Sequence, residues 1–376
     1  MPIPKWYNIL IKDFEAPLFY LQSNFMGIFS RSKRTSEAGR KKGFFKKRWL
    51  KILLVIILLV LATGGWAMYK TGATLSKIST KDGFFSSLWK ALPGVGSNQL
   101  QGQAEGQINI LLLGMRGDNM PGGGLLADSI MIASIRPQEN KIALISIPRD
   151  LYVQDPGTSS QSKINAVNAL YEGKEEGKGM EMMKQVVSDV TGLPIHYVVR
   201  IDFKGFTELV DKVGGVDVYL DNPFSEPKQF EGEAASNFSL PAGKNHLDGT
   251  KALFFVRARY ASSDFERAKR QQQVLIALKD KMLSLGTLSD FTKVNNILNI
   301  LGDDVRADMD ISEMKKFFDL ANKIQDPKMK QKVFDTTPEG LLYASKADTP
   351  EGKTYILLPE GGNYDKVRDA CRNIFQ

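Results

Sequence analysis

Short apolar runs bounded by turn-forming residues recur along the chain from residue 108 onward. Ile108–Leu113 is such a run and ends at Gly114, which predicts a strand buried on both faces. Ser129–Ile135 and Lys141–Ile147 are also strand-like, and the four residues between them favour a turn. These two segments therefore form a predicted β-hairpin.

The register of this hairpin follows from its four-residue loop. The loop pairs Arg136 with Lys141, and the same register sets Asp128 opposite Arg149. A carboxylate and a guanidinium group would then meet at the open end of the hairpin. A plain cross-strand ion pair, which stabilises by roughly 0.2–1 kcal/mol, is the simpler interpretation of this contact.

Helical and strand-like patterns alternate after the hairpin. They predict helices over residues 180–190, 203–213 and 248–256, the last two capped by Asp202 and Asp248, and strands over residues 195–201 and 216–220. Residues 254–256 would equally suit a strand. Residues 223–245 indicate a loop, residues 285–333 a mainly helical region, and residues 341–376 a closing strand at 355–358 with a terminal helix. The alternation predicts an α/β fold with a central mixed β-sheet flanked by helices on both faces.

A further helix begins at Ser263 or Asp264, because Ser263 and Glu266 have the spacing of a capping box. Arg267, Arg270 and Gln271 then share one face of its opening turns. Such a face suits an anion better than a core, and the helix N-terminus adds N–H groups and partial positive charge.

Two more arginines precede this helix. Arg257 and Arg259 point the same way if their segment is extended, and they would join Arg267 and Arg270 in one small volume. Arginine fits phosphate oxygens bidentately, so this cluster predicts a phosphate site. The alternative is a solvated helix face with surface ion pairs to Asp264 and Glu266.

Residues 52–69 contain no charge and are long enough for a transmembrane helix, while ten basic residues and one glutamate occupy residues 31–51. We therefore expect an uncleaved single-pass anchor in the cell membrane, with the N-terminus cytoplasmic and the remainder extracellular. The predicted parts are a basic cytoplasmic tail (1–48), the anchor (49–70), a linker (71–106), a folded domain (107–284) and a C-terminal region packed on that domain (285–376).

The net charge of +8 arises within this basic tail, and the rest of the chain is close to neutral. Nucleic acid is therefore not an expected partner, whereas the membrane is. The single cysteine excludes an intrachain disulfide, and the two histidines are too isolated to predict a zinc site.

Several motifs occur in the order seen in the LytR-CpsA-Psr family, which this sequence resembles over residues 108–283. They are I-N-I-L-L-L-G at 108–114, A-D-S at 127–129, S-I-P-R-D at 146–150, K-I-N-A at 163–166, V-D-K-V-G-G-V at 210–216, L-D-G-T-K-A-L at 247–253, V-R-A-R at 256–259 and D-F-E-R-A-K-R-Q-Q at 264–272.

The resemblance implies a membrane-anchored phosphotransferase that moves a glycopolymer from a polyprenyl-pyrophosphate carrier to peptidoglycan. By resemblance, Arg149, Arg257, Arg259, Arg267 and Gln271 match the positions that bind pyrophosphate. Asp128 matches the acidic residue near a Mg²⁺ or Mn²⁺ ion, and Asp264 matches the one that orients the arginines. Arg149, Asp128 and Arg267 are the expected catalytic residues.

The sequence departs from the family pattern in two places. Arg116 stands where the family commonly has an aspartate, and Leu126 where it has an arginine. Asp118 is then the candidate second metal ligand, from a shifted loop. The departure leaves open two other functions: a regulatory protein that binds polyprenyl phosphate, and a polyprenyl pyrophosphatase.

Overall fold

The computed structural model describes residues 99–118, 124–227, 230, 237–286, 293–294, 297, 301–324, 326–349 and 352–376. All of them belong to the second of two compact units, Gly64–Gln376. The predicted tail, the predicted anchor and residues 71–98 of the predicted linker lie outside the described residues. Across the ranges described, no helix combines the length and the apolar composition needed to cross a bilayer.

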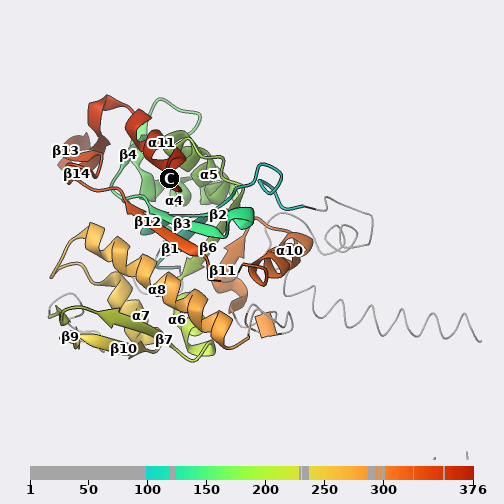
Figure 1. The fold of residues 1–376 in the computed structure, drawn as a ribbon. Coiled ribbons are helices and arrows are strands. Elements are labelled where there is room, and N and C mark those ends of the chain that lie inside the picture. The colour runs from blue at the N-terminus through green and yellow to red at the C-terminus, as the bar shows by residue number, and fades with distance from the viewer. Residues whose placement is uncertain are drawn as a thin grey trace, which may run out of the picture. The chain divides into compact units, whose positions relative to one another are not determined.

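A six-stranded mixed sheet forms the centre of the described unit (Figure 1). Its strand order is β11-β6-β1-β2-β3-β12, with β1–β2, β2–β3 and β6–β11 antiparallel and β1–β6 and β3–β12 parallel. The bounds are β1 Ile108–Met115, β2 Ser129–Arg136, β3 Lys141–Ser146, β6 Tyr197–Asp202, β11 Val305–Ala307 and β12 Lys328–Val333. The central mixed sheet predicted from the sequence is confirmed.

The predicted hairpin is confirmed in its register as well as its strands. Arg136 pairs with Lys141, and the pairing continues to Met131 opposite Ser146. The short 3-10 helix η1 (Pro137–Glu139) and Asn140, which adopts a left-handed conformation, make the turn.

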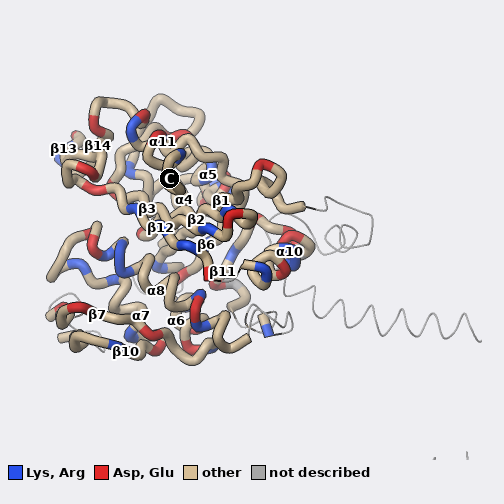
Figure 2. Tube along the Cα trace, in the orientation of Figure 1, with Lys and Arg blue, Asp and Glu red and all other residues tan. Residues whose placement is uncertain are grey.

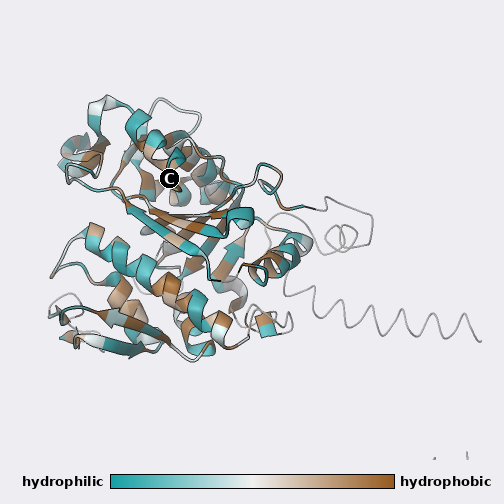
Figure 3. Cartoon of the chain, in the orientation of Figure 1, coloured by the Kyte–Doolittle hydropathy of each residue, from teal (hydrophilic) through white to brown (hydrophobic). Residues whose placement is uncertain are grey.

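Helices cover both faces of this sheet (Figure 1). On one face α4 (Ile164–Glu172), α5 (Lys178–Thr191) and α11 (Asp365–Arg372) share a hydrophobic core with β1, β2 and β3. On the other side lie α6 (Phe203–Lys212), α7 (Gly249–Arg257), α8 (Asp264–Ser284) and α10 (Ile311–Ala321). Figure 3 shows the hydrophobic residues concentrated in the central strands and in the helix faces turned toward them.

The helix caps follow the sequence prediction. Asp202 accepts a hydrogen bond from Gly205 N at the start of α6, and Asp248 accepts one from Lys251 N at the start of α7. The alternative of a strand over residues 254–256 is wrong, because these residues complete α7. The extended segment predicted for Arg257 is also wrong, since Arg257 is the last residue of this helix.

The predicted loop over residues 223–245 contains short strands, so that prediction is wrong. β8 (Phe224–Glu226) pairs with β9 (Phe238–Leu240), and β10 (Gly243–Leu247) pairs with β7 (Val216–Leu220). β7 was predicted as a strand, but it lies in this separate ribbon and not in the central sheet. The segment is rich in polar residues, and only its pairing partners make it extended.

The structure of the C-terminal region also differs from the prediction. Residues 285–333 were expected to be mainly helical, yet β11 and β12 within them form the two edges of the central sheet. β13 (Leu342–Thr349) and β14 (Gly352–Pro359) form a hairpin where a single closing strand was predicted. The predicted terminal helix is α11. At the other end of the unit, Leu100 from the predicted linker is buried, so packing begins before residue 107.

Candidate functional site

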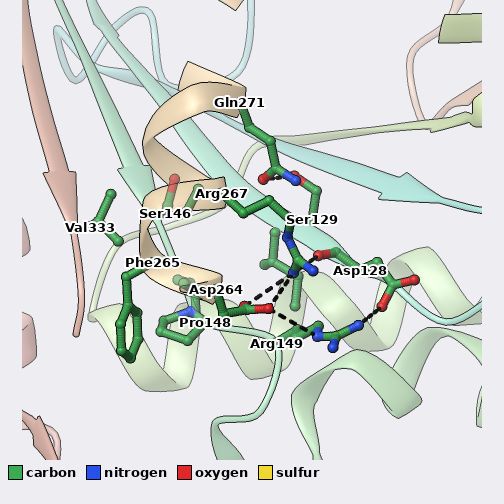
Figure 4. A pocket seen from close by; sticks show the side chains of 13 residues that line it. Asp128, Ser129, Ser146, Pro148, Arg149, Asp264, Phe265, Arg267, Gln271 and Val333 are labelled. Carbon is green, nitrogen blue, oxygen red and sulfur yellow. Dashed lines mark hydrogen bonds and ion pairs between the residues drawn. The ribbon is translucent and has the colours of Figure 1, made fainter. Parts of the chain in front are cut away.

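Arg149 and Asp128 meet at the open end of the β2–β3 hairpin, as the register predicts. Ile147 N donates to Ile130 O at 2.9 Å, which extends the pairing toward them. Arg149 Nη1 then donates to Asp128 Oδ1 at 2.6 Å. Both residues line a small pocket together with the first turns of α8 (Figure 4). The contact is therefore partly exposed at this pocket, with 19% of the Arg149 side chain and 34% of the Asp128 side chain accessible to solvent.

The N-terminus of α8 forms the facing wall of the pocket. Ser263 is the N-cap, because its Oγ accepts a hydrogen bond from Glu266 N at 3.1 Å. Arg267 Nη2 lies 2.9 Å from Asp264 Oδ1 and donates to Asp128 O at 3.1 Å. Asp264 Oδ1 also lies 3.5 Å from Arg149 Nε. Asp264 thus lies between two guanidinium groups and fixes their relative orientation (Figure 4).

The electrostatics of the two arginines differ. Burial lowers the pKa of Arg149, but Asp128, Asp264 and Asp150 together raise it above its ordinary value. Burial is the largest influence on the pKa of Arg267 and leaves it below its ordinary value; the carboxylates of Asp264 and Asp128 raise it, and the charges of Arg149 and Arg259 lower it. The charged form of Arg267 is therefore less favourable here than in water. An anion in the pocket would stabilise this charged form.

Arg149 also carries a buried donor that the described protein leaves unused. Its Nε has no hydrogen-bond partner among the described residues. The nearby carboxylate oxygens, Asp264 Oδ1 at 3.5 Å and Asp150 Oδ2 at 3.9 Å, are too distant for a hydrogen bond. A buried unsatisfied donor costs about 1–3 kcal/mol. An oxygen atom of a bound ligand would remove this cost.

Gln271 completes the inner end of the pocket, one turn further along α8. Ser129 Oγ donates to Gln271 Oε1 at 3.0 Å, and Gln271 Nε2 donates to Val256 O at 3.3 Å. The amide is thereby held between β2 and α7. Ser129, which the sequence reasoning gave no role, is a lining residue that orients Gln271.

Arg270 does not lie in this pocket, and the sequence prediction of one shared arginine face is corrected here. Its guanidinium group donates to the carbonyl oxygens of Phe255 and Ala258 and to Ser262 Oγ. It also lies over the ring of Phe224, at 4.9 Å from the centroid. Burial lowers the pKa of Arg270 to about 10. Arg270 therefore holds the end of α7 and the loop before α8 in place.

This difference predicts opposite roles for the two α8 arginines in stability. Arg270→Lys is expected to lower the free energy of unfolding by on the order of 3 kcal/mol, because charge-assisted hydrogen bonds to buried carbonyls are lost. Arg267→Ala is expected to lower it by less, since Asp264 keeps Arg149 as a partner and repulsion from Arg149 and Arg259 is relieved. Urea unfolding of the two variants measures both effects. Equal losses would contradict the distinction.

Arg257 and Arg259 are not among the residues that line the pocket. Arg257 lies over the rings of Phe203 and Phe230, with centroid distances of 4.9 and 5.2 Å. Arg259 follows α7 and is close enough to lower the pKa of Arg267. The structure thus brings Arg259 toward the site and places Arg257 against an aromatic cluster beside it.

The two predicted metal ligands, Asp128 and Asp118, differ in their position relative to the pocket. Asp128 lines the pocket, whereas Asp118 is exposed and does not line it. In the part of the chain that the structure describes, no three His, Cys, Asp or Glu side chains are grouped closely enough to hold a metal ion. Of the two predicted metal ligands, Asp128 is therefore the one whose side chain lies at the pocket.

The sequence profile of the LytR_cpsA_psr family matches residues 76–368, which include every residue of this pocket. The chain belongs to the LytR-CpsA-Psr family. It is 32% identical over 290 residues to the polyisoprenyl-teichoic acid–peptidoglycan teichoic acid transferase TagU of Oceanobacillus iheyensis, covering 76% of this chain and 83% of that protein.

Solved structures have the same fold. The crystal structure of Bacillus subtilis TagV has a TM-score of 0.53 and 26% sequence identity, covering 71% of this chain and 96% of that chain. The structure titled TagT bound to LIIa-WTA also has a TM-score of 0.53, at 22% identity, covering 72% and 90% of the two chains. The mixed sheet with flanking helices is therefore the fold of these LytR-CpsA-Psr relatives.

Residues of the K-I-N-A stretch hold the backbone around the site, a role that the sequence alone did not indicate. Lys163 Nζ donates to Asp150 Oδ1 at 2.6 Å, and Asn165 N donates to Arg149 O at 3.3 Å. Asn165 O accepts from Ala127 N at 2.9 Å. This part of the LytR-CpsA-Psr pattern therefore fixes the backbone on both sides of the Arg149–Asp128 contact. The sequence signal for this role was that K-I-N-A is one of the family motifs.

The two departures from the LytR-CpsA-Psr pattern, Arg116 and Leu126, lie at the same end of the central strands as Asp128 and Arg149. Arg116 follows β1, whose Gly114 pairs with Ser129. Gly117 has a φ of +89°, and a Cβ at this position would lie 2.8 Å from Asp202. The loop is thus held against β6 at Gly117. Leu126 is 45% exposed, so the position adjoining Ala127 and Asp128 presents an apolar surface.

Proposed function

We propose that this chain is a membrane-anchored phosphotransferase that transfers a glycopolymer from a polyprenyl-pyrophosphate carrier to peptidoglycan. The family relatives named above as teichoic acid transferases support this function. The observation that carries it is the unsatisfied Nε of Arg149, buried near Asp264 and Asp150 in a pocket with Arg267. A pyrophosphate oxygen is the acceptor that this arrangement lacks.

The reaction requires positioning and charge stabilisation more than a covalent intermediate. An acceptor sugar hydroxyl attacks the phosphorus atom that carries the glycopolymer and forms a new P–O bond. The P–O bond to the bridging oxygen breaks, and polyprenyl phosphate leaves with that electron pair. The hydroxyl proton passes to solvent. Arg149 and Arg267 hold the phosphate oxygens, and Asp264 keeps both guanidinium groups in position.

A Mg²⁺ or Mn²⁺ ion fits beside these arginines in our proposal. Asp128 supplies a carboxylate, which suits such hard cations, and Mg²⁺ commonly takes one or two protein carboxylates together with substrate phosphates and water. Asp118 would add a second carboxylate if its loop turned toward the pocket. When bound, the cation would polarise the phosphoryl oxygens and offset the developing charge.

The lipid is proposed to leave the pocket on the side of α6 and α7. On that side, Arg257 at the end of α7 stacks on Phe203 and Phe230. Beyond it lies a hydrophobic cluster rich in phenylalanine, to which both helices contribute. An isoprenoid chain requires an apolar surface of this kind. A membrane anchor in residues 49–70 would keep the extracellular domain near the lipid.

The test is a transfer assay with the full-length chain in detergent. Polyprenyl pyrophosphate bearing a labelled glycopolymer is supplied with or without soluble peptidoglycan oligosaccharides. We expect label on the oligosaccharide through a phosphodiester, and little release without acceptor. Rapid release of label in water alone would favour the pyrophosphatase function. Tight donor binding without either product would favour the regulatory binding protein.

A further inference from the structure

The β13–β14 hairpin is joined to the segment that directly follows Arg149. Leu357 N of β14 donates to Asp150 O at 2.9 Å, and Leu151 and Leu357 form an isolated parallel bridge. Leu342 and Leu357 are buried in the same core as Leu151. The root of the hairpin is therefore fixed to the residue that follows Arg149. Its position relative to the arginines is set by the backbone, and not by a flexible contact.

The pleat of β14 places Tyr355 on the same face of the hairpin as Leu357, two residues further along the strand. This is the face that packs toward Leu151, next to Asp150. Tyr355 is 46% exposed. Burial raises the pKa of Tyr355, and the carboxylates of Asp150 and Asp264 raise it further. The charges of both carboxylates therefore act on the Tyr355 hydroxyl.

The exposed part of the Tyr355 ring is accessible to a ligand. A tyrosine with almost half of its surface in water contributes little to a core, whereas its flat apolar face and its hydroxyl suit a sugar ring. Lys346 pairs with Tyr355 across the hairpin and shares its face, and it adds a hydrogen-bond donor there. The face combines an aromatic ring with a polar neighbour.

The direction of the reaction decides which sugar meets this face. In phosphoryl transfer the attacking and leaving oxygens are roughly in line, on opposite sides of the phosphorus. In the proposed function the polyprenyl phosphate leaves toward α6 and α7, and the hairpin lies on the other side of the sheet from these helices (Figure 1). The attacking hydroxyl therefore comes from the hairpin side.

We propose that Tyr355, on the face of the β13–β14 hairpin that packs toward Leu151, stacks on a sugar ring of the acceptor glycan and determines acceptor affinity. This inference rests on the proposed function, since it assigns the acceptor side of the same site. It makes Tyr355 a specificity-determining residue that contacts substrate. Tyr355 takes no part in holding the pyrophosphate.

The hairpin provides its own control. Tyr343 on β13 is 44% exposed, but it pairs with Leu358 and therefore projects from the opposite face. Tyr343→Ala and Tyr355→Ala remove the same side chain with the same exposure from the same two strands. Only the second variant changes the face of the hairpin that carries Leu357.

The experiment measures acceptor and donor separately with the full-length chain in detergent. Tyr355→Ala is expected to raise the KM for a peptidoglycan oligosaccharide about three- to tenfold, while Tyr355→Trp stays near the parent value because stacking is kept. The donor Kd and kcat should change by less than about twofold, and the melting temperature should change by less than a few degrees. Tyr343→Ala should match the parent protein throughout.

An unchanged acceptor KM in Tyr355→Ala would overturn the inference, as would an equal effect of Tyr343→Ala. A weaker donor Kd with the same acceptor KM would assign the ring to the donor and also overturn it. Calorimetric titration of the oligosaccharide onto the protein without donor keeps the test independent of turnover. If the parent chain binds the oligosaccharide through Tyr355 but transfers nothing, the proposed function fails and the acceptor site stands.

Discussion

Arg149→Lys is expected to lower the transfer rate at least about tenfold, although the side chain keeps its charge. Lysine would keep an ion pair with Asp128 but would lose the second donor, the Nε that lies unsatisfied in the pocket. Arg149→Ala is expected to lower the rate by on the order of 10²- to 10³-fold, as for loss of a group that stabilises transition-state charge. Initial rates of transfer at saturating donor measure both.

Arg136→Lys is the matched control for this variant. Arg136 lies at the opposite end of the same hairpin, where its guanidinium group pairs with Glu139 at 3.2 Å. The substitution should leave the transfer rate unchanged. Full activity of Arg149→Lys would show that charge alone suffices and would remove the support for bidentate pyrophosphate binding.

Asp128→Asn is expected to be nearly inactive at any Mg²⁺ concentration, and a chelator should abolish the activity of the parent chain until Mg²⁺ or Mn²⁺ is restored. Asparagine keeps the shape of the side chain but removes the negative charge that attracts the cation. It also weakens the 2.6 Å contact that orients Arg149. Transfer rates and Mn²⁺ binding by electron paramagnetic resonance measure the two consequences.

Glu139→Gln serves as the control, because it removes a carboxylate from the turn of the same hairpin without touching the pocket. Asp118→Asn separates the ligand assignments. If Asp118→Asn is as active as the parent chain, Asp128 acts with water and substrate oxygens alone. Unchanged Mn²⁺ binding in Asp128→Asn would contradict its role as a metal ligand.

Basic and acidic residues are scattered over much of the described chain (Figure 2), so a cluster of arginines in the sequence does not by itself define a binding site. The structure separates the arginines by what each guanidinium group contacts. Arg149 and Arg267 meet carboxylates at the pocket, Arg257 meets aromatic rings, and Arg270 meets backbone carbonyls. Side-chain direction, and not spacing in the sequence, gives each its role.

The sequence by itself determined the features that depend on neighbouring residues. The N-cap Ser263, the caps of α6 and α7, and the four-residue turn between β2 and β3 are each specified within a few positions. The hairpin register then placed Asp128 against Arg149, because a register leaves no freedom once the turn length is set. The family motifs extended this to Asp264, Arg267 and Gln271.

Only the tertiary structure decided the features that depend on distant segments. β11 and β12 are short and partly polar, and they become strands because the two sheet edges offer them unpaired backbone groups. Arg270 turns to the end of α7 because buried carbonyls there need donors, which helix periodicity does not reveal. The placement of Tyr355 beside Asp150 likewise depends on a backbone contact across about two hundred residues of chain, from Asp150 to Leu357. Such contacts depend on long-range packing, and no local pattern of residues encodes them.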